Sequence, residues 1–333
     1  MADEPAGLAD EKARPLLSTD GQIEHLAAKG VSFDLCARED AASYLAGANN
    51  LFRTSSYRKL FPVQDQGKRA GEYLGLDFGH LRALSSLDRK LRMCFLTITV
   101  DVEHFARIKL LRACELNGED GYAVVIDYLA QANHKIRNHI MGNMKGRSEE
   151  GEKFDEYSGD LIAHYLGKRM PVWVFLEVVE FGALNSFYLF CAERWGDKEM
   201  RQEHYVLRSV QKLRNACAHN SCVLNGVART TGEDTESDVN ELITKSLNAH
   251  GMARSKTRRA RLNNLRTEQM ASALYASNKI CTREETRRRH AAALADLRRA
   301  WLEESSLFAK NNVVTSFFEF FFKMVDIWIP ERQ

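Results

Sequence analysis

The feature that most limits how this chain can fold is a long apolar repeat that starts after Asp77 and ends before Gly118. Apolar side chains recur there at steps of three and four residues, which is the period of one face of an α-helix. Asp77 is a suitable N-cap and Gly118 a suitable stop. The repeat therefore predicts one helix of about ten turns, which serves as a scaffold for the rest of the fold.

Further helices are indicated on both sides of this repeat, and no useful stretch alternates as a strand does. Only five prolines occur, and three of them lie near the ends. Hydrophobic residues make up 44% and charged residues 28%, as in an ordinary globular protein. We expect an all-α protein. The expected helices start at residues 19, 38, 122, 171 and 197, the one from Pro171 running to Phe190, and residues 141–160 are expected to form a loop.

Several functional classes are disfavoured by what the sequence lacks. The first residues are acidic and small, unlike a secretory signal, so a cytoplasmic location is expected. The most apolar run, residues 317–329, is interrupted by charges and too short to cross a bilayer, so it predicts a buried terminal helix. The seven cysteines are scattered, without a C-x-x-C pair. There is no compact set of metal ligands, Walker A loop or dinucleotide fingerprint, so we expect no metal and no cofactor, and nucleic acid is the favoured ligand.

The stretch QKLRNACAHN, residues 211–220, concentrates Arg214, Asn215 and His219 within an amphipathic segment. One interpretation is a solvated helix face. The other is metal-free RNA cleavage, because a histidine can accept and donate protons near neutral pH and an arginine can stabilise a phosphate. On a helix Asn215 and His219 share a face, whereas Arg214 lies about 140° from His219. Arg214 must therefore bend round, or a second copy of the helix must face the first.

Five blocks of sequence in order resemble a known family. RNACAH is similar to the Arg-polar-x-x-x-His motif of the HEPN ribonuclease superfamily, and the chain more closely resembles the Abi-like (AbiD/AbiF) proteins of bacterial abortive infection. The other four blocks are TDGQIEHLAAKG from residue 19, NNLFRTSSYRKLF from residue 49, the helix of Asp88 and Arg92 that runs on to VEHFAR, and PVWVFLEVVEFGALNS from residue 171.

The resemblance implies a HEPN-type helical bundle and an RNA endonuclease of phage-defence or toxin type. It also implies a composite site in which two motifs meet. Because the chain offers one credible motif, a homodimer is expected. The resemblance further implies association with a small structured RNA, which controls activity in some relatives. Arg214 would bind the phosphate, His219 would act as general acid and base, and Asn215 would orient them. The alternative is a non-catalytic HEPN module that binds RNA or a partner.

The predicted layout is a flexible tail over residues 1–17, the Abi-like HEPN domain over 18–225, a polar loop over 226–240 and a basic helical extension over 241–333. The aromatic end of that extension is expected to pack on the core. Glu103 and Arg107 are either a helix-stabilising i,i+4 pair or, as the resemblance suggests, a brace in which Glu103 holds Arg214.

Two groups of basic residues are candidates for RNA binding. Residues 254–299 carry nine more basic than acidic side chains, the footprint expected for a phosphate backbone, although a solvated helix face is the simpler reading. The candidates there are Arg254, Lys256, Arg258, Arg259, Arg261, Arg287, Arg288 and Arg289. Arg53, Arg58 and Lys59 are interleaved with aromatic residues that can stack on bases or pack in the core. His134 and His139 are expected on the surface, and Trp173 in the core or a dimer interface.

Overall fold

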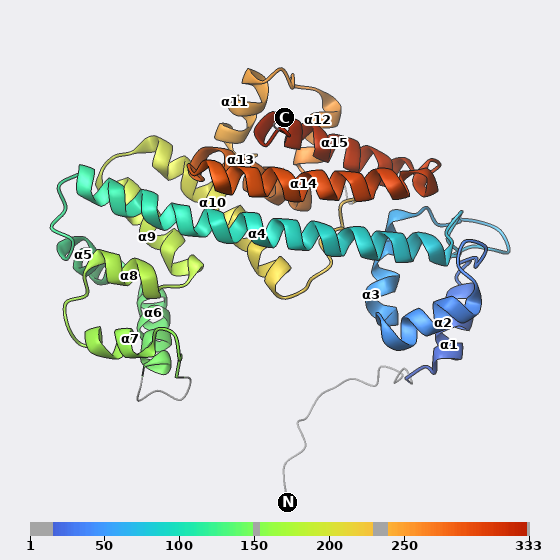
Figure 1. Cartoon of the computed structure of the whole chain (residues 1–333), viewed down its shortest axis with the longest axis horizontal. Helices are drawn as coiled ribbons and strands as arrows, with labels where there is room; N and C mark the ends of the chain where they lie inside the picture. Colours follow the sequence, from blue (N-terminus) through green and yellow to red (C-terminus); the bar gives the residue numbers. More distant parts are fainter. Residues whose placement is uncertain (1–15, 149–153, 229–238, 332–333) are drawn as a thin grey trace, which may run out of the picture. The chain divides into compact units, whose positions relative to one another are not determined.

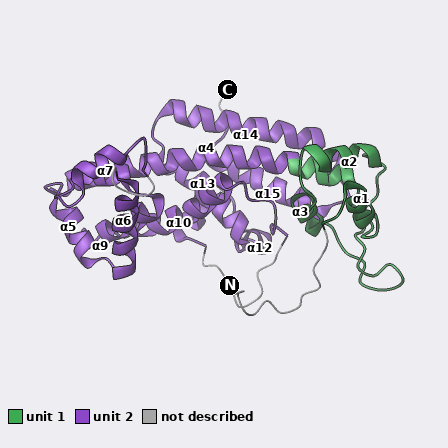
Figure 2. Ribbon diagram, turned by 90° about the horizontal axis from the view of Figure 1, so that it is seen from below, with its two compact units in different colours: residues 1–85 green, residues 86–333 purple. Residues whose placement is uncertain are grey.

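A computed structural model of the chain describes residues 16–148, 154–228 and 239–331. In these residues the all-α prediction is confirmed, because the regular elements are helices and extended pairing is limited to two isolated bridges (Figure 1). The chain divides into two compact units, residues 1–85 and 86–333 (Figure 2). The predicted tail falls almost wholly outside the described residues, as does most of the predicted polar loop.

Unit 1 contains short helices fixed by side-chain caps. They are α1 (Thr19–Ala27), α2 (Arg38–Gly47), α3 (Leu51–Ser56) and the 3-10 helix η1 (Tyr57–Leu60). The hydroxyl of Ser18 accepts the N–H of Gly21, as an N-cap should. Gly30 follows α1 with φ of 81°, and a Cβ there would lie 2.9 Å from the carbonyl oxygen of Tyr73, so only glycine fits.

The long helix α4 (Phe78–Leu116) has 39 residues and confirms the prediction from the apolar repeat. Its start is fixed by the buried carboxylate of Asp77. One oxygen of Asp77 accepts the N–H of Gly79, and the other accepts the hydroxyl of Ser32 and the N–H of Asp34. At 1.5 Å per residue the helix is about 58 Å long, enough to carry many packing partners along one element.

Unit 2 comprises α4 from residue 86 onward and the remaining helices. They are α5 (Ala123–Gln131), α6 (His134–Arg147), α7 (Gly159–Tyr165), α8 (Val172–Val178), α9 (Phe181–Arg194), α10 (Lys198–Ala218), α11 (Glu241–Ala249), α12 (Lys256–Leu262), α13 (Leu265–Ile280), α14 (Glu284–Glu304), the 3-10 helix η2 (Ser305–Phe308) and α15 (Asn312–Trp328).

Two of the predicted boundaries are wrong. Residues 141–147 belong to α6 rather than to a loop, because Ile140 and Met144 are buried and tertiary packing overrides the polar, glycine-containing sequence. The helix expected from Pro171 to Phe190 is two helices, since the backbone is extended at Val179 between α8 and α9. The carbonyls at this break accept hydrogen bonds from arginine side chains instead of from the next helical turn.

The core of the C-terminal part is α13, which is buried on every side over residues 267–277. It packs against α10 and α15. The aromatic run in α15 is buried, and Phe318 stacks on Trp301 with ring centroids 4.2 Å apart. The prediction of a buried terminal helix is confirmed. Trp173, in contrast, is half exposed and meets Tyr122 edge to face, so it is not a core residue.

A buried polar chain joins α14 to α4, which run side by side (Figure 1). His290, fully buried, contacts the carboxylate of Asp101 on α4 at 2.7 Å through Nε2 and the hydroxyl of Ser277 on α13 at 2.8 Å through Nδ1. Burial lowers the pKa of His290, so the neutral ring accepts the Ser277 proton and donates to Asp101. Burial pushes the pKa of Asp101 upward, but hydrogen bonds from Arg289 and His290 outweigh this and lower it.

In the described parts of the chain, no helix is both long and apolar enough to cross a membrane.

Candidate active site at the end of α10

The predicted motif occupies the last turn of α10, and Asn220 ends that helix. Asn220 has φ of 56°, the left-handed conformation of a residue that follows a helix C-cap. The N–H of Ser221 donates to the carbonyl of Ala216 at 2.8 Å, and the N–H of Asn220 donates to the carbonyl of Cys217 at 3.1 Å. This is a Schellman motif. It makes His219 the C-cap residue, exposed at the point where the chain leaves the helix.

Arg214 is held in place by two neighbours. Its guanidinium donates to Oδ1 of Asn215 at 3.0 Å and lies 3.4 Å from Oε2 of Glu103 on α4. The Arg214 side chain remains 35% exposed, whereas that of Glu103 is 11% exposed. Asn215 also accepts the N–H of His219 through its backbone carbonyl at 2.9 Å. The structure thus brings together Glu103, Arg214 and Asn215, with Arg214 oriented but still reachable from solvent.

Glu103 is itself shared between two arginines. Its other oxygen, Oε1, accepts a hydrogen bond from Arg107 at 2.7 Å. Arg107 also donates to the carbonyls of Leu176 and Val179, at the end of α8. Arg107 therefore connects α4 to the break between α8 and α9, and it holds the carboxylate that orients Arg214.

The segment that follows His219 is held by Asp88, a residue for which no such role was predicted. Asp88 of α4 is completely buried and forms an ion pair with Arg92. Its Oδ1 accepts the N–H of Leu224 at 2.8 Å and contacts the thiol of Cys222 at 3.6 Å. The position was visible as part of the Asp-x-x-Leu-Arg block, but its contact with residues more than 130 positions away was not.

The block from Pro171 to Ser186 contributes residues of α9 that pack against α10, the helix that carries the motif. A Cβ on Gly182 would lie 3.0 Å from Nε2 of Gln211, so glycine allows α9 to approach α10 closely. The buried side-chain amide of Asn185 donates to Oε1 of Gln211 at 3.0 Å, and the backbone carbonyl of Asn185 contacts Nδ1 of His204 at 2.8 Å. Gly182 and Asn185 thus position α10 one turn before Arg214.

The end of α10 presents a guanidinium and an imidazole, the groups that bind a phosphate and transfer a proton beside it. The His219 ring makes no hydrogen bond to any residue in the described ranges, so it is available to a ligand. The five-residue offset directs Arg214 toward Glu103 and His219 away from it. One chain therefore presents an oriented cation and an exposed imidazole on different sides of the same helix end.

The basic residues of α12 and of the segment just before it do not form a continuous exposed face. Arg254, Lys256 and Arg259 are exposed. Arg258 is buried, with its guanidinium donating to Oδ1 of Asn248 at 2.7 Å and to the carbonyl of Met252, which corrects its assignment to an RNA-binding surface. Arg261 is partly buried and donates to the hydroxyl of Ser316. These two arginines hold the C-terminal helices together.

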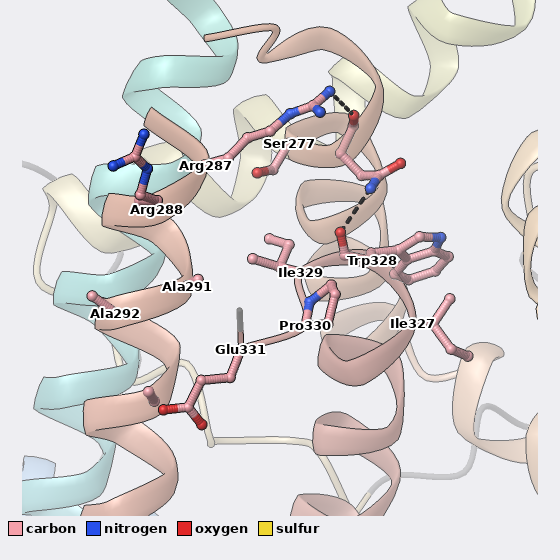
Figure 3. Close-up of a pocket in the computed structure, with 12 residues that line it drawn as sticks. Ser277, Arg287, Arg288, Ala291, Ala292, Ile327, Trp328, Ile329, Pro330 and Glu331 are labelled. Carbon is pink, nitrogen blue, oxygen red and sulfur yellow. Dashed lines mark hydrogen bonds between the residues drawn. The ribbon is translucent and has the colours of Figure 1, made fainter. Parts of the chain in front are cut away.

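The three consecutive residues Arg287, Arg288 and Arg289 have different partners. Figure 3 shows Arg287 reaching across to α13, where it donates to the carbonyl of Asn278 at 3.0 Å, while Arg288 points the other way. Arg287 also donates to the carbonyl of Cys281 at 2.8 Å and so caps α13. Arg289 pairs with Asp101 at 2.8 Å. Arg288 is the most exposed of the three, 3.8 Å from Glu284.

In unit 1 the candidate residues Arg53, Arg58 and Lys59 lie on α3 and η1. Lys59 is exposed and Arg53 is half-buried. The guanidinium of Arg58 lies 5.7 Å from the ring centre of Tyr73. Of the neighbouring aromatics, Tyr57 and Phe61 are buried in the core of the unit and Phe52 is exposed.

His134 and His139 are exposed on α6, as predicted. Three or more histidine, cysteine, aspartate or glutamate side chains do not gather into a possible metal site anywhere in the residues that the structure describes.

Comparison with known proteins identifies the family. The sequence pattern of a family described as "Abi-like protein" matches residues 46–225, more than half of the chain. The matched range contains Asp88, Glu103, the block from Pro171 and the whole motif, and it ends where the predicted domain ends. No curated protein and no solved structure matches. The family suggests a role in abortive infection, a form of phage defence. The chain belongs to the family of Abi-like proteins.

Proposed function

We propose that this protein is a metal-independent RNA endonuclease that acts in phage defence. The observation that carries the proposal is the end of α10, where an oriented but accessible Arg214 and an exposed His219 occur in a chain of the Abi-like family. Arginine is suited to a phosphate because its planar guanidinium offers several donors. Histidine is suited to proton transfer near neutral pH.

In the proposed reaction the 2′-hydroxyl of one nucleotide attacks its own 3′-phosphate. A neutral imidazole of His219 takes the 2′-hydroxyl proton as the new O–P bond forms, and the bond to the 5′-oxygen breaks. The 5′-oxygen takes a proton from an acid, and the products are a 2′,3′-cyclic phosphate and a 5′-hydroxyl. Arg214 stabilises the charge that builds on the phosphate, and Asn215 keeps Arg214 in place.

The base and the acid of this reaction call for two imidazoles, whereas each chain supplies one such motif. We therefore propose a homodimer in which two α10 ends face one RNA, so that one His219 acts as base and the other as acid. The divergence of Arg214 and His219 around a single helix end supports this arrangement.

The proposed partners are RNA as substrate and, as a regulator, a small structured RNA. Among the predicted contacts, Arg254, Lys256, Arg259, Arg288 and Arg289 are exposed in unit 2, Arg289 while paired with Asp101, and Lys59 is exposed in unit 1. These side chains are the candidates for phosphate contacts. Arg53, half-buried, and Arg58, beside Tyr73, stay proposed contacts of unit 1.

One observation favours a second function, a non-catalytic HEPN module that binds RNA or a partner protein. Arg214 is already paired with Glu103, which offsets part of the charge that a phosphate would meet. In that case the motif would serve recognition alone.

Cleavage of RNA in EDTA distinguishes the two functions. We expect the native protein to cut RNA, and Arg214→Ala and His219→Ala each to lose at least about 100-fold in rate, as is typical when a general acid-base or charge-stabilising group is removed. His250→Ala is the matched control, because His250 is also an exposed C-cap histidine, on α11. Unchanged rates in both motif variants would refute the assignment. Binding of RNA without cleavage by any form would favour the second function.

A further inference from the structure

The exposed side of α10 carries a regular row of side chains that leads to the motif. At about 100° per residue, positions 201, 205, 208, 212, 215 and 219 lie within about 40° of one line along the helix. They are occupied by Arg201, Tyr205, Arg208, Lys212, Asn215 and His219. From residue 201 to residue 219 these positions span about 27 Å along the helix axis. We call Arg201, Tyr205, Arg208 and Lys212 the α10 row.

The α10 row is exposed and carries only positive charge. All four side chains are exposed, Tyr205 by 41%, while the opposite side of the helix is buried against α9 and α13. The carboxylates of α10 itself, Glu199 and Glu203, lie about 160° around the helix. Glu203 is buried and bound by Lys109 and Tyr188.

One carboxylate from a neighbouring helix acts on the row. Glu268 of α13 interacts electrostatically with Lys212, but it is buried and accepts hydrogen bonds from Ser209 and Ser272. Burial raises the pKa of Glu268, and its hydrogen bonds hold the carboxylate between α10 and α13.

The cations of the α10 row have no structural task within the described chain. Arg258, Arg287 and Arg289 are bound to carbonyls or a carboxylate. Arg201, Arg208 and Lys212, in contrast, make no ion pair or side-chain hydrogen bond with a residue that the structure describes. Three unpaired cations and an accessible tyrosine ring at helical spacing are the groups that bind a single strand, through its phosphates and by stacking on a base.

We propose that the α10 row binds single-stranded RNA and guides it to His219. This rests on the proposed function, because the row gains its purpose from the motif at its end. Arg201, Arg208 and Lys212 contact successive phosphates, and Tyr205 stacks on a base between them. The substrate class is then unpaired RNA, because a base must be unstacked from its neighbours to lie on Tyr205.

The test measures binding of a single-stranded 2′-O-methyl oligoribonucleotide of about 12 nucleotides to the full-length protein, in EDTA and over a range of salt concentrations. This probe cannot be cut through its 2′-oxygen, so binding is separated from cleavage. We expect Arg208→Gln with Lys212→Gln to weaken binding at least tenfold. Loss of two phosphate contacts should also reduce the slope of log K against log salt by about 1.4.

Two controls make the result specific to the row. The double variant Lys279→Gln with Lys310→Gln removes the same charge from exposed sites elsewhere in unit 2 and should leave binding unchanged. Tyr205→Ala should weaken binding about tenfold, whereas Tyr205→Phe, which keeps the stacking ring, should not.

The outcomes separate this proposal from the proposed function. If the row double variant binds the probe like the native protein, or loses no more affinity than the Lys279 and Lys310 control, the row is not an RNA track even where the native protein cleaves RNA. If binding depends on the row but the native protein cuts no unmodified RNA, the track stands and the catalytic assignment fails. Equal affinity for a fully paired duplex and for the single strand would overturn the assignment to unpaired RNA.

Discussion

At the scale of single residues, the site depends on how one carboxylate is shared. One carboxylate oxygen of Glu103 accepts a hydrogen bond from Arg107, and the other forms an ion pair with Arg214. Arg107 is committed to the end of α8, so the negative charge of Glu103 is fixed in position. Arg214 is thereby held in one orientation while a third of its surface stays open to a ligand. In the proposed reaction Glu103 would act through Arg214, which makes it a positioning residue.

Replacing Glu103 with glutamine tests this role. We expect Glu103→Gln to lower kcat about tenfold, the value of one charge-assisted interaction of about 1.4 kcal/mol, with little change in KM. Glu115→Gln, on the exposed face of the same helix, is the control and should leave both constants unchanged. A Glu103→Gln enzyme with native kcat would show that Arg214 needs no carboxylate to be oriented.

The local residue pattern indicated the candidate site residues, but it did not predict the distant residues that hold them in position. QKLRNACAHN indicated Arg214, Asn215 and His219, because their chemistry is contained in ten residues. The contact of Asp88 with Leu224 and the approach of Gly182 to Gln211 depend on how distant segments pack, and no local pattern encodes that. The predicted basic surface was also too large. Arg258 was counted as part of it, but its side chain is buried and donates a hydrogen bond to Asn248.

At the scale of elements, α4 is the part that aligns the motif, because three of its carboxylates reach three different neighbours. Asp88 holds the segment after α10, Glu103 holds Arg214, and Asp101 receives His290 of α14. The apolar repeat predicted this helix to within two residues, since its cap, period and stop all lie within one stretch. The break between α8 and α9 was not predicted, because arginines from α4 and α6 create it.

The buried pair of Asp88 and Arg92 should contribute strongly to stability. Asp88→Ala leaves Arg92 buried without its partner and the N–H of Leu224 without its acceptor, so we expect unfolding in urea to require about 3–5 kcal/mol less. Asp296→Ala removes an aspartate from an exposed pair with Arg299 and should change the free energy of unfolding by less than about 0.5 kcal/mol. Equal losses in the two variants would contradict the role given to Asp88.

The His290 chain should make the docking of α14 sensitive to acid. The pKa of His290 is lowered, so below about pH 6.5 the unfolded chain binds a proton that the folded chain does not. The free energy of unfolding should therefore decrease from about pH 7 toward pH 5. His290→Gln should have a lower Tm at neutral pH and a smaller decrease over this range. Some decrease should remain, because burial also lowers the pKa of His204. A decrease as steep as in the native protein would exclude His290 as its source.

At the scale of the whole molecule, the C-terminal third is built into unit 2. The α13 helix is buried between α10 and α15, and Ser209 of α10 donates to Glu268 of α13. A basic segment was expected over residues 254–299, but residues 267–277 within it are buried and form part of the core. The described parts of residues 241–333 therefore support the motif helix directly.

The proposed dimer gives a prediction at this scale. A chain of 37.9 kDa should be found in solution at about twice that mass. Because the proposed site needs one His219 from each chain, an excess of His219→Ala mixed with the native protein should form heterodimers that lack one imidazole, and should lower the activity per native chain. A monomeric native protein that cleaves RNA would contradict the composite site.

The most direct test of the central claim is the chemistry of the ends that the protein leaves on RNA in EDTA. Proton transfer by His219 beside Arg214 predicts 2′,3′-cyclic phosphate and 5′-hydroxyl ends, present with the native protein and lost with His219→Ala. Ends bearing 3′-hydroxyl and 5′-phosphate groups, or cyclic phosphate ends formed equally by His219→Ala, would contradict it.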